Sequence, residues 1–314
     1  MRKPPDPDTI LDVSTRLEAA IAATPALSQA SPQEVIRIVP GKRAVLRGRL
    51  GDRTVIFRLF LTQGDATPAL EWAEMTRAWP QMNAGHLRIA EPLHFVPAHG
   101  LVVIEDVPGT PLLQLLYQTD PAQRAQWLIP AADWLRRYTR ASERTAAAQH
   151  RRWLDRARAA ADSQPHASLR RAEAKVLAQL TRLAPAMDGH SWRVAVSHGD
   201  FHPNNLIAQA PRLTGIDTGG SASLPVYKDM ARFLMHMGRR GMLPSGEARF
   251  GVDRQGITAF RDAFEMSEAE ETLHLPYMLG CEALLRVESR AIKPGRVRRA
   301  AKMYEGLITD LERL

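Results

Sequence analysis

The hydrophobic pattern of the sequence changes near residue 105, and this change restricts the chain to a mixed α+β fold. Before it, short segments alternate between apolar and polar residues, which is typical of strands with one buried face. After Pro108-Gly109 the sequence is rich in Ala, Leu and Arg and follows the helical period. We therefore expect a small antiparallel sheet with one helix, followed by a larger and mostly helical part. The strands are expected at residues 35–39, 43–50, 53–61, 91–96 and 101–104, and the helix of this part at 68–79.

The same pattern divides the chain into three parts. Residues 1–32 contain a helix and a Pro/Ser-rich joint, residues 33–106 contain the sheet, and residues 107–314 contain most of the helices. In the last part, short strands at 206–208 and 213–216 are expected to pair as a hairpin. The helices of the first and last parts are expected at residues 9–23, 111–117, 121–148, 150–162, 167–184, 226–238, 256–264, 267–289 and 295–313.

The composition is that of a globular protein with an ordinary core. The 314 residues are 45% hydrophobic and 24% charged, and no apolar run approaches the roughly 18 residues that span a bilayer. The first residues lack the apolar stretch of a signal peptide. Cys281 is the only cysteine, which fits a reducing compartment, and its apolar surroundings indicate a packed thiol rather than a nucleophile. We expect a cytoplasmic protein without a membrane segment.

The formal net charge of +8 is compatible with a nucleic-acid partner, an anionic small substrate or no specific ligand. The arginines are spread over the expected helices beside Ala and Leu, so most of them are expected on solvated helix faces. No expected strand combines basic and aromatic residues as RNA-binding strands do. A nucleic-acid partner is therefore not expected.

One segment, from His198 to Asn205, contains side chains suited to phosphoryl transfer. Asp200 precedes Asn205 by five positions, which is the spacing of a kinase catalytic loop, where the Asp accepts the hydroxyl proton and the Asn binds Mg²⁺. Asp217 is followed two positions later by Gly219, as in the kinase Asp-x-Gly, and is a second candidate ligand. The expected hairpin would bring Asn205 and Asp217 to the same end of two paired strands. Their side-chain oxygens suit Mg²⁺, which leaves Asp200 to orient an acceptor hydroxyl and accept its proton.

These motifs resemble those of the aminoglycoside phosphotransferase / choline kinase-like family. The resemblance rests on His198-Gly199-Asp200-x-His202-x-x-Asn205, on Ile216-Asp217, and on Asp229-Met230-Ala231, where Asp229 comes twelve positions after Asp217. It implies a bilobal protein-kinase-like fold, with residues 33–106 as the nucleotide-binding N-lobe and 107–314 as a helical C-lobe that holds the catalytic loop and the acceptor site. It also implies transfer of phosphate from ATP, with Mg²⁺, to a hydroxyl of a sugar, amino sugar, amino alcohol or similar metabolite.

The resemblance also implies roles for individual residues. Asp200 becomes the catalytic base, and Asn205 and Asp217 become the metal ligands. Three further residues are implied to support the catalytic loop without contacting metal: His198, His202 and Asp229.

The nucleotide contacts are less clearly marked. In kinases a strand Lys contacts the phosphates and pairs with a helix Glu. Alternation along its strand places Arg58 on the same face as Ile56 and Phe60, which is an unusual place for a solvated charge. We infer that Arg58 takes the position of the Lys, although its planar fork is not equivalent to an ammonium group. Glu74 and Glu71 are the candidate partners, and Glu74 is preferred.

Two further segments are candidates for nucleotide contacts. The segment with Glu105 and Val107 follows the last strand of the sheet and corresponds to the family's hinge, whose backbone contacts the adenine edge; a plain linker is the alternative. No Gly-x-Gly-x-x-Gly is present. The turn from Pro40 to Arg43 offers backbone N–H groups to phosphates, and an ordinary hairpin turn is the alternative.

Two other functions stay open. The Arg at position 58 and the missing Gly-rich loop are also compatible with a catalytically idle kinase-like protein that binds a nucleotide or another ligand. His198, Asp200 and His202 would share one face of a strand, as the ligands of a metal-dependent hydrolase do, although Pro203 interrupts such a strand.

The acceptor is weakly constrained by the sequence. A polycationic aminoglycoside would need an acidic pocket, and the glutamates between Glu265 and Glu271 are candidates for it, although they also fit a solvated helix end. The segment from Arg286 to Lys302 is strongly basic and favours a neutral or anionic acceptor, such as a sugar or a phosphorylated or carboxylated metabolite. The sequence distinguishes neither ATP from GTP nor one oligomeric state from another.

Overall fold

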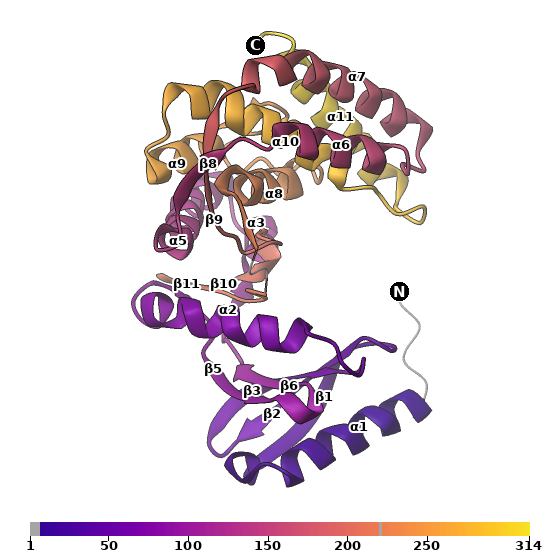
Figure 1. Ribbon diagram of the computed structural model, residues 1–314, viewed down its shortest axis with the longest axis vertical. Helices are drawn as coiled ribbons and strands as arrows, with labels where there is room; N and C mark the ends of the chain where they lie inside the picture. The colour runs from indigo at the N-terminus through magenta and orange to yellow at the C-terminus, as the bar shows by residue number, and fades with distance from the viewer. Residues whose placement is uncertain (1–6, 220–221) are drawn as a thin grey trace. The chain divides into compact units, whose positions relative to one another are not determined.

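The computed structural model describes residues 7–219 and 222–314 and contains two compact units (Figure 1). The smaller unit includes the chain up to Gly109 and a second segment that begins at Thr214, whereas the larger unit consists of Thr110–Leu213 and Ala222–Leu314. The segment around Asp217 therefore belongs to the smaller unit, although it follows the loop from His198 to Asn205 in sequence. The separate functions expected for residues 1–32, 33–106 and 107–314 stay predictions.

A five-stranded antiparallel sheet in the order β1-β2-β3-β6-β5 forms the centre of the smaller unit. The predicted strands are confirmed, with one correction at β1, which begins inside the predicted joint because Ala30 and Ser31 pair with Leu50 and Arg49. The strands of this unit are β1 (Ala30–Val39), β2 (Arg43–Leu50), β3 (Arg53–Phe60), β4 (Leu87–Ile89), β5 (Pro92–Val96) and β6 (Leu101–Glu105).

Two helices cover opposite faces of this sheet (Figure 1). Leu17 of the first helix shares a core with Phe57, and Met75 of the second shares another core with Phe60. Because side chains alternate along β3, Arg58 lies on the same face as Phe60, beneath the second helix, as predicted. The helices of this unit are α1 (Pro7–Ala22) and α2 (Thr67–Met82), with single turns η1 (Pro25–Leu27) and η2 (Pro97–His99).

The larger unit is mainly helical, and its central helix is α10 (Leu275–Leu285). Residues 275–284 of this helix are all buried, as expected for a helix that is apolar on every side. It packs against α6, α7 and α8. The other helices are α3 (Leu112–Gln118), α4 (Pro121–Ala125), α5 (Leu128–Arg140), α6 (His150–Ala161), α7 (Ala167–Leu183), α8 (Val226–Gly238), α9 (Arg254–Phe264) and α11 (Pro294–Leu311), with short helices η3 (Ala184–Met187), η4 (Pro203–Asn205) and η5 (Glu270–His274).

Short strands connect these helices. β8, β9 and β12 form one antiparallel sheet in the order β12-β9-β8, and β10 pairs with β7. The predicted strands at 206–208 and 213–216 are present as β10 and β11. The strands that lie mainly in the larger unit are β7 (Thr110–Pro111), β8 (Arg144–Ala147), β9 (Ser191–Val196), β10 (Leu206–Gln209), β11 (Arg212–Gly215), β12 (Ser223–Pro225), β13 (Ala248–Arg249) and β14 (Val252–Asp253).

Two helix predictions are wrong in extent. The single helix predicted at 121–148 is divided into α4 and α5, and its last residues form β8, because pairing with β9 overrides the helix propensity of Ala146 and Ala147. The helix predicted at 267–289 begins with the π-helical turn η5 and ends at Leu285.

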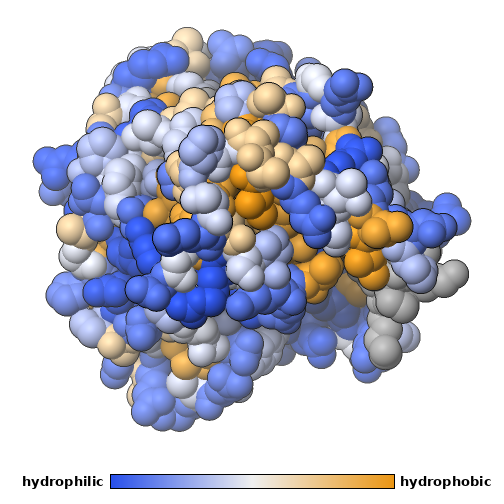
Figure 2. Space-filling view, turned by 90° about the horizontal axis from the view of Figure 1, so that it is seen from below, coloured by the Kyte–Doolittle hydropathy of each residue, from blue (hydrophilic) through white to orange (hydrophobic). Residues whose placement is uncertain are grey.

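The surface is that of a polar protein with interspersed apolar groups. The face in Figure 2 is mainly hydrophilic, and apolar patches interrupt it. Large exposed apolar side chains include Ile10 and Leu11 on α1 and Val35 and Ile36 on β1. In the described part of the chain, every helix is too short or too polar to cross a bilayer.

Candidate active site

The loop that follows β9 is held by the start of α8. The Asp229 carboxylate accepts hydrogen bonds from the backbone N–H groups of His198, at 2.7 Å, and Gly199, at 3.4 Å. The neighbouring Lys228 ammonium donates to the Gly199 carbonyl oxygen and, at 3.2 Å, to Asp229. Gly199 has a φ of +84°, which disfavours a residue with a side chain. Asp229 and Lys228 thus bind two N–H groups and one carbonyl oxygen of the loop backbone, and these bonds hold its conformation.

His198 supports this loop from the interior. Its ring is buried and lies 5.8 Å from the Trp134 and Phe201 ring centroids and 6.1 Å from that of Tyr138. In the described part of the chain, no group of three His, Cys, Asp or Glu side chains is placed to hold a metal ion. The hydrolase site considered from the sequence is therefore not supported, because its histidine is packed among aromatic rings.

Asp200 carries the exposed carboxylate of the loop, with 52% of its side chain accessible. Arg232 Nε donates to its Oδ1 at 2.9 Å, and Arg286 Nη2 lies 3.7 Å from the same oxygen. His202 Nε2 lies 3.4 Å from Oδ2. Partial burial raises the pKa of Asp200, but the hydrogen bond with His202 and the charge of Arg232 lower it further, so its pKa lies well below the usual range. Asp200 is ionised at neutral pH.

Asn205 is oriented by the same residue. Its Nδ2 donates to the Asp200 carbonyl oxygen at 3.0 Å, and its backbone N–H donates to the His202 carbonyl oxygen at 2.9 Å. With Nδ2 engaged in this way, the Asn205 Oδ1 atom is available to coordinate a cation, and no described residue donates a hydrogen bond to it. A side-chain oxygen next to an ionised carboxylate fits a hard divalent cation.

A second cluster of predicted residues lies in the smaller unit. One nitrogen of the Arg58 guanidinium donates to Glu71 of α2, and another donates to Asp217. The side chains of Arg58 and Glu71 are buried, whereas that of Asp217 is 37% exposed. Burial lowers the pKa of Arg58, but the charges of Asp217 and Glu71 more than offset this effect and the pKa is raised. The guanidinium therefore stays charged between two carboxylates.

The preference for Glu74 as the partner of Arg58 is wrong. Glu74 binds Arg77, three residues further along α2, at 2.6 and 2.9 Å, and Glu71 binds Arg58 instead. The local partner Arg77 satisfies Glu74 within its own helix, which the strand and helix patterns alone did not reveal. The contact between Glu74 and Arg77 gives no support for a role of Glu74 in nucleotide binding.

The backbone at Asp217 is strained. Its φ is +59°, in the left-handed region that non-glycine residues seldom occupy and that Asp tolerates better than most. Gly215, two residues before Asp217, is hydrogen-bonded to the smaller unit, because the Ala90 N–H donates to its carbonyl oxygen at 3.0 Å. Strain of this kind is found at functional sites, where the surroundings impose it.

The predicted hinge residues have different environments. Both carboxylate oxygens of Glu105 bind Arg88, and the Glu105 backbone N–H donates to the Glu91 carbonyl oxygen at 3.0 Å. The Glu105 side chain thus serves a structural ion pair. Val107 packs with Ile56 against the core beneath α2. Contact of their backbones with a nucleotide base stays a prediction.

The turn from Pro40 to Arg43 is a tight hairpin connection. Gly41 has a φ of +67°, its carbonyl oxygen accepts from Thr62 Oγ1 at 2.8 Å, and Lys42 N–H donates to Val39. These bonds explain the turn without a ligand, and a phosphate contact stays a prediction.

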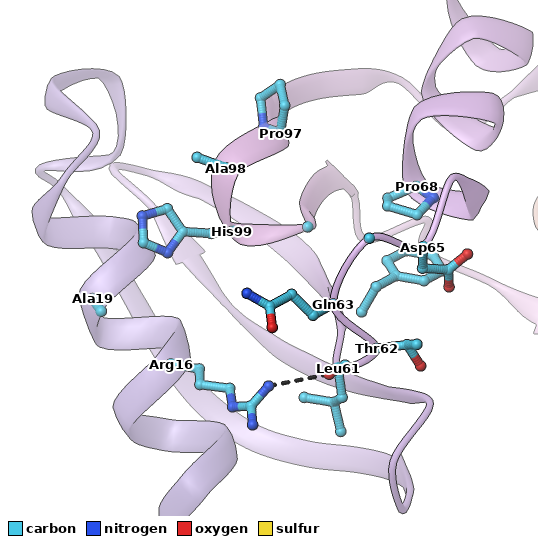
Figure 3. Close-up of a pocket in the computed structure, with 13 residues that line it drawn as sticks. Arg16, Ala19, Leu61, Thr62, Gln63, Asp65, Pro68, Pro97, Ala98 and His99 are labelled. Atoms are coloured by element: carbon cyan, nitrogen blue, oxygen red, sulfur yellow. Dashed lines mark hydrogen bonds between the residues drawn. The ribbon is translucent and has the colours of Figure 1, made fainter.

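A cavity of about 690 Å³ opens in the smaller unit between α1, the β3–α2 connection and the β5–β6 turn (Figure 3). Arg16 extends across it from α1 and donates to the Leu61 carbonyl oxygen at 3.1 Å, and Gln63 and His99 border the same space. None of the site residues predicted from the sequence lines this cavity.

Sequence reasoning missed three side chains that shape the loop: Lys228, Arg232 and Glu282. Arg232 contacts Asp200, and the buried Glu282 lies 3.8 Å from Arg232. Each is a charged residue within an apolar stretch of helix. That placement was the available signal, because a charge on a buried helix face needs a partner.

The predicted residues thus form two groups, one in each unit. Asp200, Asn205 and their supports lie in the larger unit, and Arg58 and Asp217 lie in the smaller one. The convergence of Asn205 and Asp217 on one cation stays a prediction.

The fold is shared with solved small-molecule kinases. A choline/ethanolamine kinase family protein from Mesorhizobium loti is 16% identical, with a TM-score of 0.59 over 97% of this chain and 100% of that one. A glucosamine kinase is 16% identical, with a TM-score of 0.60 over 96% and 85%. An amicoumacin kinase in complex with AMP-PNP, Ca²⁺ and Ami is 12% identical, with a TM-score of 0.57 over 95% and 96%. At these identities the likeness shows the fold alone, and it confirms the predicted α+β, protein-kinase-like class.

Sequence comparison identifies the family. No curated protein gives a significant match to this chain. The family model described as APH, the phosphotransferase enzyme family, matches residues 23–256, which is more than half of the chain and includes both predicted clusters. The suspected resemblance to aminoglycoside phosphotransferases and choline kinases is thereby confirmed: the chain belongs to the phosphotransferase enzyme family.

Proposed function

We propose that the protein transfers the γ-phosphate of ATP, with Mg²⁺, to a hydroxyl group of a small molecule. The observation that carries this proposal is the loop at Asp200. Its carboxylate is ionised and half-exposed, while Asn205 is fixed against its backbone with an amide oxygen to offer. A phosphotransferase needs this pair of functions, because it must align a hydroxyl and hold a cation at the phosphates.

Asn205 and Asp217 would hold the Mg²⁺ ion. One is an amide and the other a carboxylate, and both belong to the oxygen donors that this ion prefers. When bound, Mg²⁺ neutralises charge on the phosphate oxygens. The kinase structure with AMP-PNP and Ca²⁺ supports the use of a nucleotide and a divalent cation.

Arg58 would contact the nucleotide phosphates. Its pairing with Glu71 orients the guanidinium on the α2 face of the sheet, where its planar fork can bind two phosphate oxygens. The partly buried apolar side chains of Ile56, Val107 and Ile216 belong to the same core and would pack against the base. The Glu105 and Val107 backbone would contact the adenine edge.

Asp200 would accept a hydrogen bond from the acceptor hydroxyl. Because its pKa is low, it is a weak base, so its main contribution is to orient the hydroxyl oxygen toward the phosphorus. It receives the proton as the new O–P bond forms, and the proton then passes to water.

A catalytically idle binding protein is the second candidate. It is favoured by one observation, the bond from Arg58 to Asp217, which engages the carboxylate proposed to hold metal. In the active protein, that bond gives way to cation and phosphate contacts. In an idle protein, it persists when nucleotide is added.

Product formation separates the two candidates. The protein is incubated with ATP, Mg²⁺ and a panel of small alcohols, and phosphorylated products are identified by mass spectrometry. Phosphorylation of an acceptor by the wild type, with a loss of about a hundredfold or more in Asp200→Asn, supports the transferase. Asp52→Asn, in the exposed β2–β3 turn, is the control and should keep full activity. Nucleotide binding without product in either protein supports the idle reading.

We also propose a cytoplasmic location, where ATP is abundant. It rests on the single cysteine, Cys281, which is buried and free.

A further inference from the structure

The face of α8 that borders the catalytic loop is cationic. Arg232 and His236 are spaced four residues apart and therefore lie along one stripe of the helix, and Arg240 follows in the turn after the helix ends at Gly238. Arg232 contacts Asp200, and the His236 ring lies 4.3 Å from that of His202. Arg240 Nη1 donates to the His236 carbonyl oxygen at 2.6 Å, which keeps its side chain on this stripe.

Two neighbouring segments add to this charge. Arg286, directly after α10, reaches within 3.7 Å of Asp200, and Arg296 lies in the first turns of α11. The first turns of α11 pack against the turn that follows α8, where a Cβ at Gly241 would lie 2.8 Å from the Arg299 side chain. The charge of Arg296 is one of the causes that lower the pKa of His236 and of Arg240. Burial is the largest cause at both groups, and the pKa of Arg240 falls to about 10.

The available carboxylates do not neutralise all of these arginines. Glu282 binds Arg286 at 2.7 Å and lies 3.8 Å from Arg232, so it is shared by the two residues nearest Asp200. In the described part of the chain, no carboxylate lies within ion-pair distance of Arg240 or Arg296. The charge of Glu288 raises the pKa of Arg240, but Glu288 itself binds Arg239 at 3.0 Å. The Nε atom of Arg296 is also buried without a hydrogen-bond partner there. Half-buried cations that form no ion pair of their own favour an anionic ligand.

The acidic segment considered for a cationic acceptor is already engaged. Glu270 accepts hydrogen bonds from Arg193 at 2.6 Å and from Tyr227 at 2.5 Å, and Glu271 lies 3.3 Å from Arg249. A polycationic acceptor would therefore meet positive charge beside Asp200 and would find these two glutamates occupied.

We propose that the acceptor is an anionic alcohol, a molecule with a hydroxyl group and a carboxylate or phosphate group, whose anion binds Arg240 and Arg296. This inference rests on the proposed function, since it names the substrate class of the same site. The acceptor hydroxyl oxygen forms a bond to the γ-phosphorus, the bond from that phosphorus to the β–γ bridging oxygen breaks, and its electron pair leaves with ADP. The hydroxyl proton passes to Asp200 and then to water.

The location of these arginines fits a role in substrate choice. The family match ends at residue 256, so Arg286 and Arg296 lie beyond the part of the chain that defines the family. Arg240, by contrast, lies inside the matched part of the chain.

The test uses acceptor pairs that differ only in their anionic group. Glucose is compared with glucose 6-phosphate, glucosamine with glucosamine 6-phosphate, and glycerol with glycerol 3-phosphate and glycerate. We expect phosphorylation of one or more anionic members and little of their neutral or cationic counterparts.

Arg240→Gln and Arg296→Gln should each raise KM for the anionic acceptor about tenfold or more, with kcat and the KM for ATP nearly unchanged. Arg298→Gln, at an exposed position of α11, is the matched control and should behave as the wild type.

A binding measurement keeps the inference testable if turnover is slow. Calorimetric titration of each anionic compound into protein saturated with AMP-PNP and Mg²⁺ should show binding that Arg240→Gln and Arg296→Gln weaken. Preference for neutral or cationic acceptors would overturn the inference and leave the phosphotransferase function intact. A rise in the KM for ATP alone would also overturn it, because the arginines would then contact the nucleotide. If ATP does not bind, the proposed function fails, and titration of the anions into the protein alone decides whether the arginine site exists.

Discussion

Arg58 joins two carboxylates that lie far apart in sequence. It donates to Glu71 on α2 and to Asp217, and its side chain is buried. A charge in this position is stable only while its partners remain, because the Arg58 guanidinium and the Glu71 carboxylate are both buried. The same pairing gives Arg58 its orientation toward the phosphates in the proposed site.

Replacement of this cation tests both roles. Arg58→Met should lower the free energy of unfolding by about 3 kcal/mol, since it leaves a buried carboxylate unpaired. It should also weaken nucleotide binding. Urea unfolding and calorimetric titration with AMP-PNP measure the two effects. Arg53→Met is the control in the same strand: its ion pair with Glu91 is exposed, so a change below about 1 kcal/mol is expected. Unaltered nucleotide affinity in Arg58→Met would show that Arg58 is not at the phosphates.

The ionisation of Asp200 gives a prediction with a definite sign. Because its pKa is depressed in the folded protein, the stability that Asp200 contributes is fully present above its unfolded value of about 4 and is lost as pH falls toward the folded pKa. Asp200→Asn should therefore be less stable than the wild type at pH 7, and the difference should shrink below about pH 4. Urea unfolding of both proteins over this range measures it. A difference that stays constant with pH would contradict the ionic contacts described for Asp200.

At the scale of elements, the first turn of α8 determines the catalytic loop. Asp229 accepts from two loop N–H groups, and Lys228 donates to the loop carbonyl between them. The helix thus positions a loop that itself has no regular hydrogen-bonding pattern. This arrangement gives Asp229 a supporting contact with the loop, without a proposed contact to the substrate.

Loss of this support should affect turnover more than binding. Asp229→Ala leaves the His198 and Gly199 N–H groups unpaired, and we expect a loss of about 1–3 kcal/mol in unfolding free energy. In kinetic assays kcat should fall more than KM rises, and Asp229→Asn, which keeps an acceptor oxygen, should recover part of it. The exposed Asp262→Ala on α9 is the control. If Asp229→Ala raised KM alone, Asp229 would have to act on substrate binding instead of loop position.

The elements show what sequence patterns can predict. Alternation and turn residues predicted the strands of the sheet, and the spacing from Asp200 to Asn205 singled out the loop in which the Asn205 side chain binds the Asp200 backbone. The Glu71 pairing and the strand β8 were missed. Both depend on partners far along the chain or on competition from a neighbour such as Arg77, and a local pattern carries no information about those partners.

At the scale of the whole molecule, the chain belongs to the phosphotransferase enzyme family and shares its fold with solved small-molecule kinases. The proposed site residues are divided between two units: Asp200 and Asn205 belong to one and Arg58 and Asp217 to the other. A function that needs all of them requires both units to act on one nucleotide. We therefore propose that one Mg²⁺ ion binds to Asn205 and Asp217 when the nucleotide is bound.

A crystal structure of the protein with AMP-PNP and Mg²⁺ tests this claim most directly. We expect one Mg²⁺ ion at about 2.1 Å from Asn205 Oδ1 and from an Asp217 carboxylate oxygen, with the Asp200 carboxylate near the γ-phosphate. A nucleotide bound without either ligand at the ion, or with Asp200 turned away from the phosphate, would contradict it.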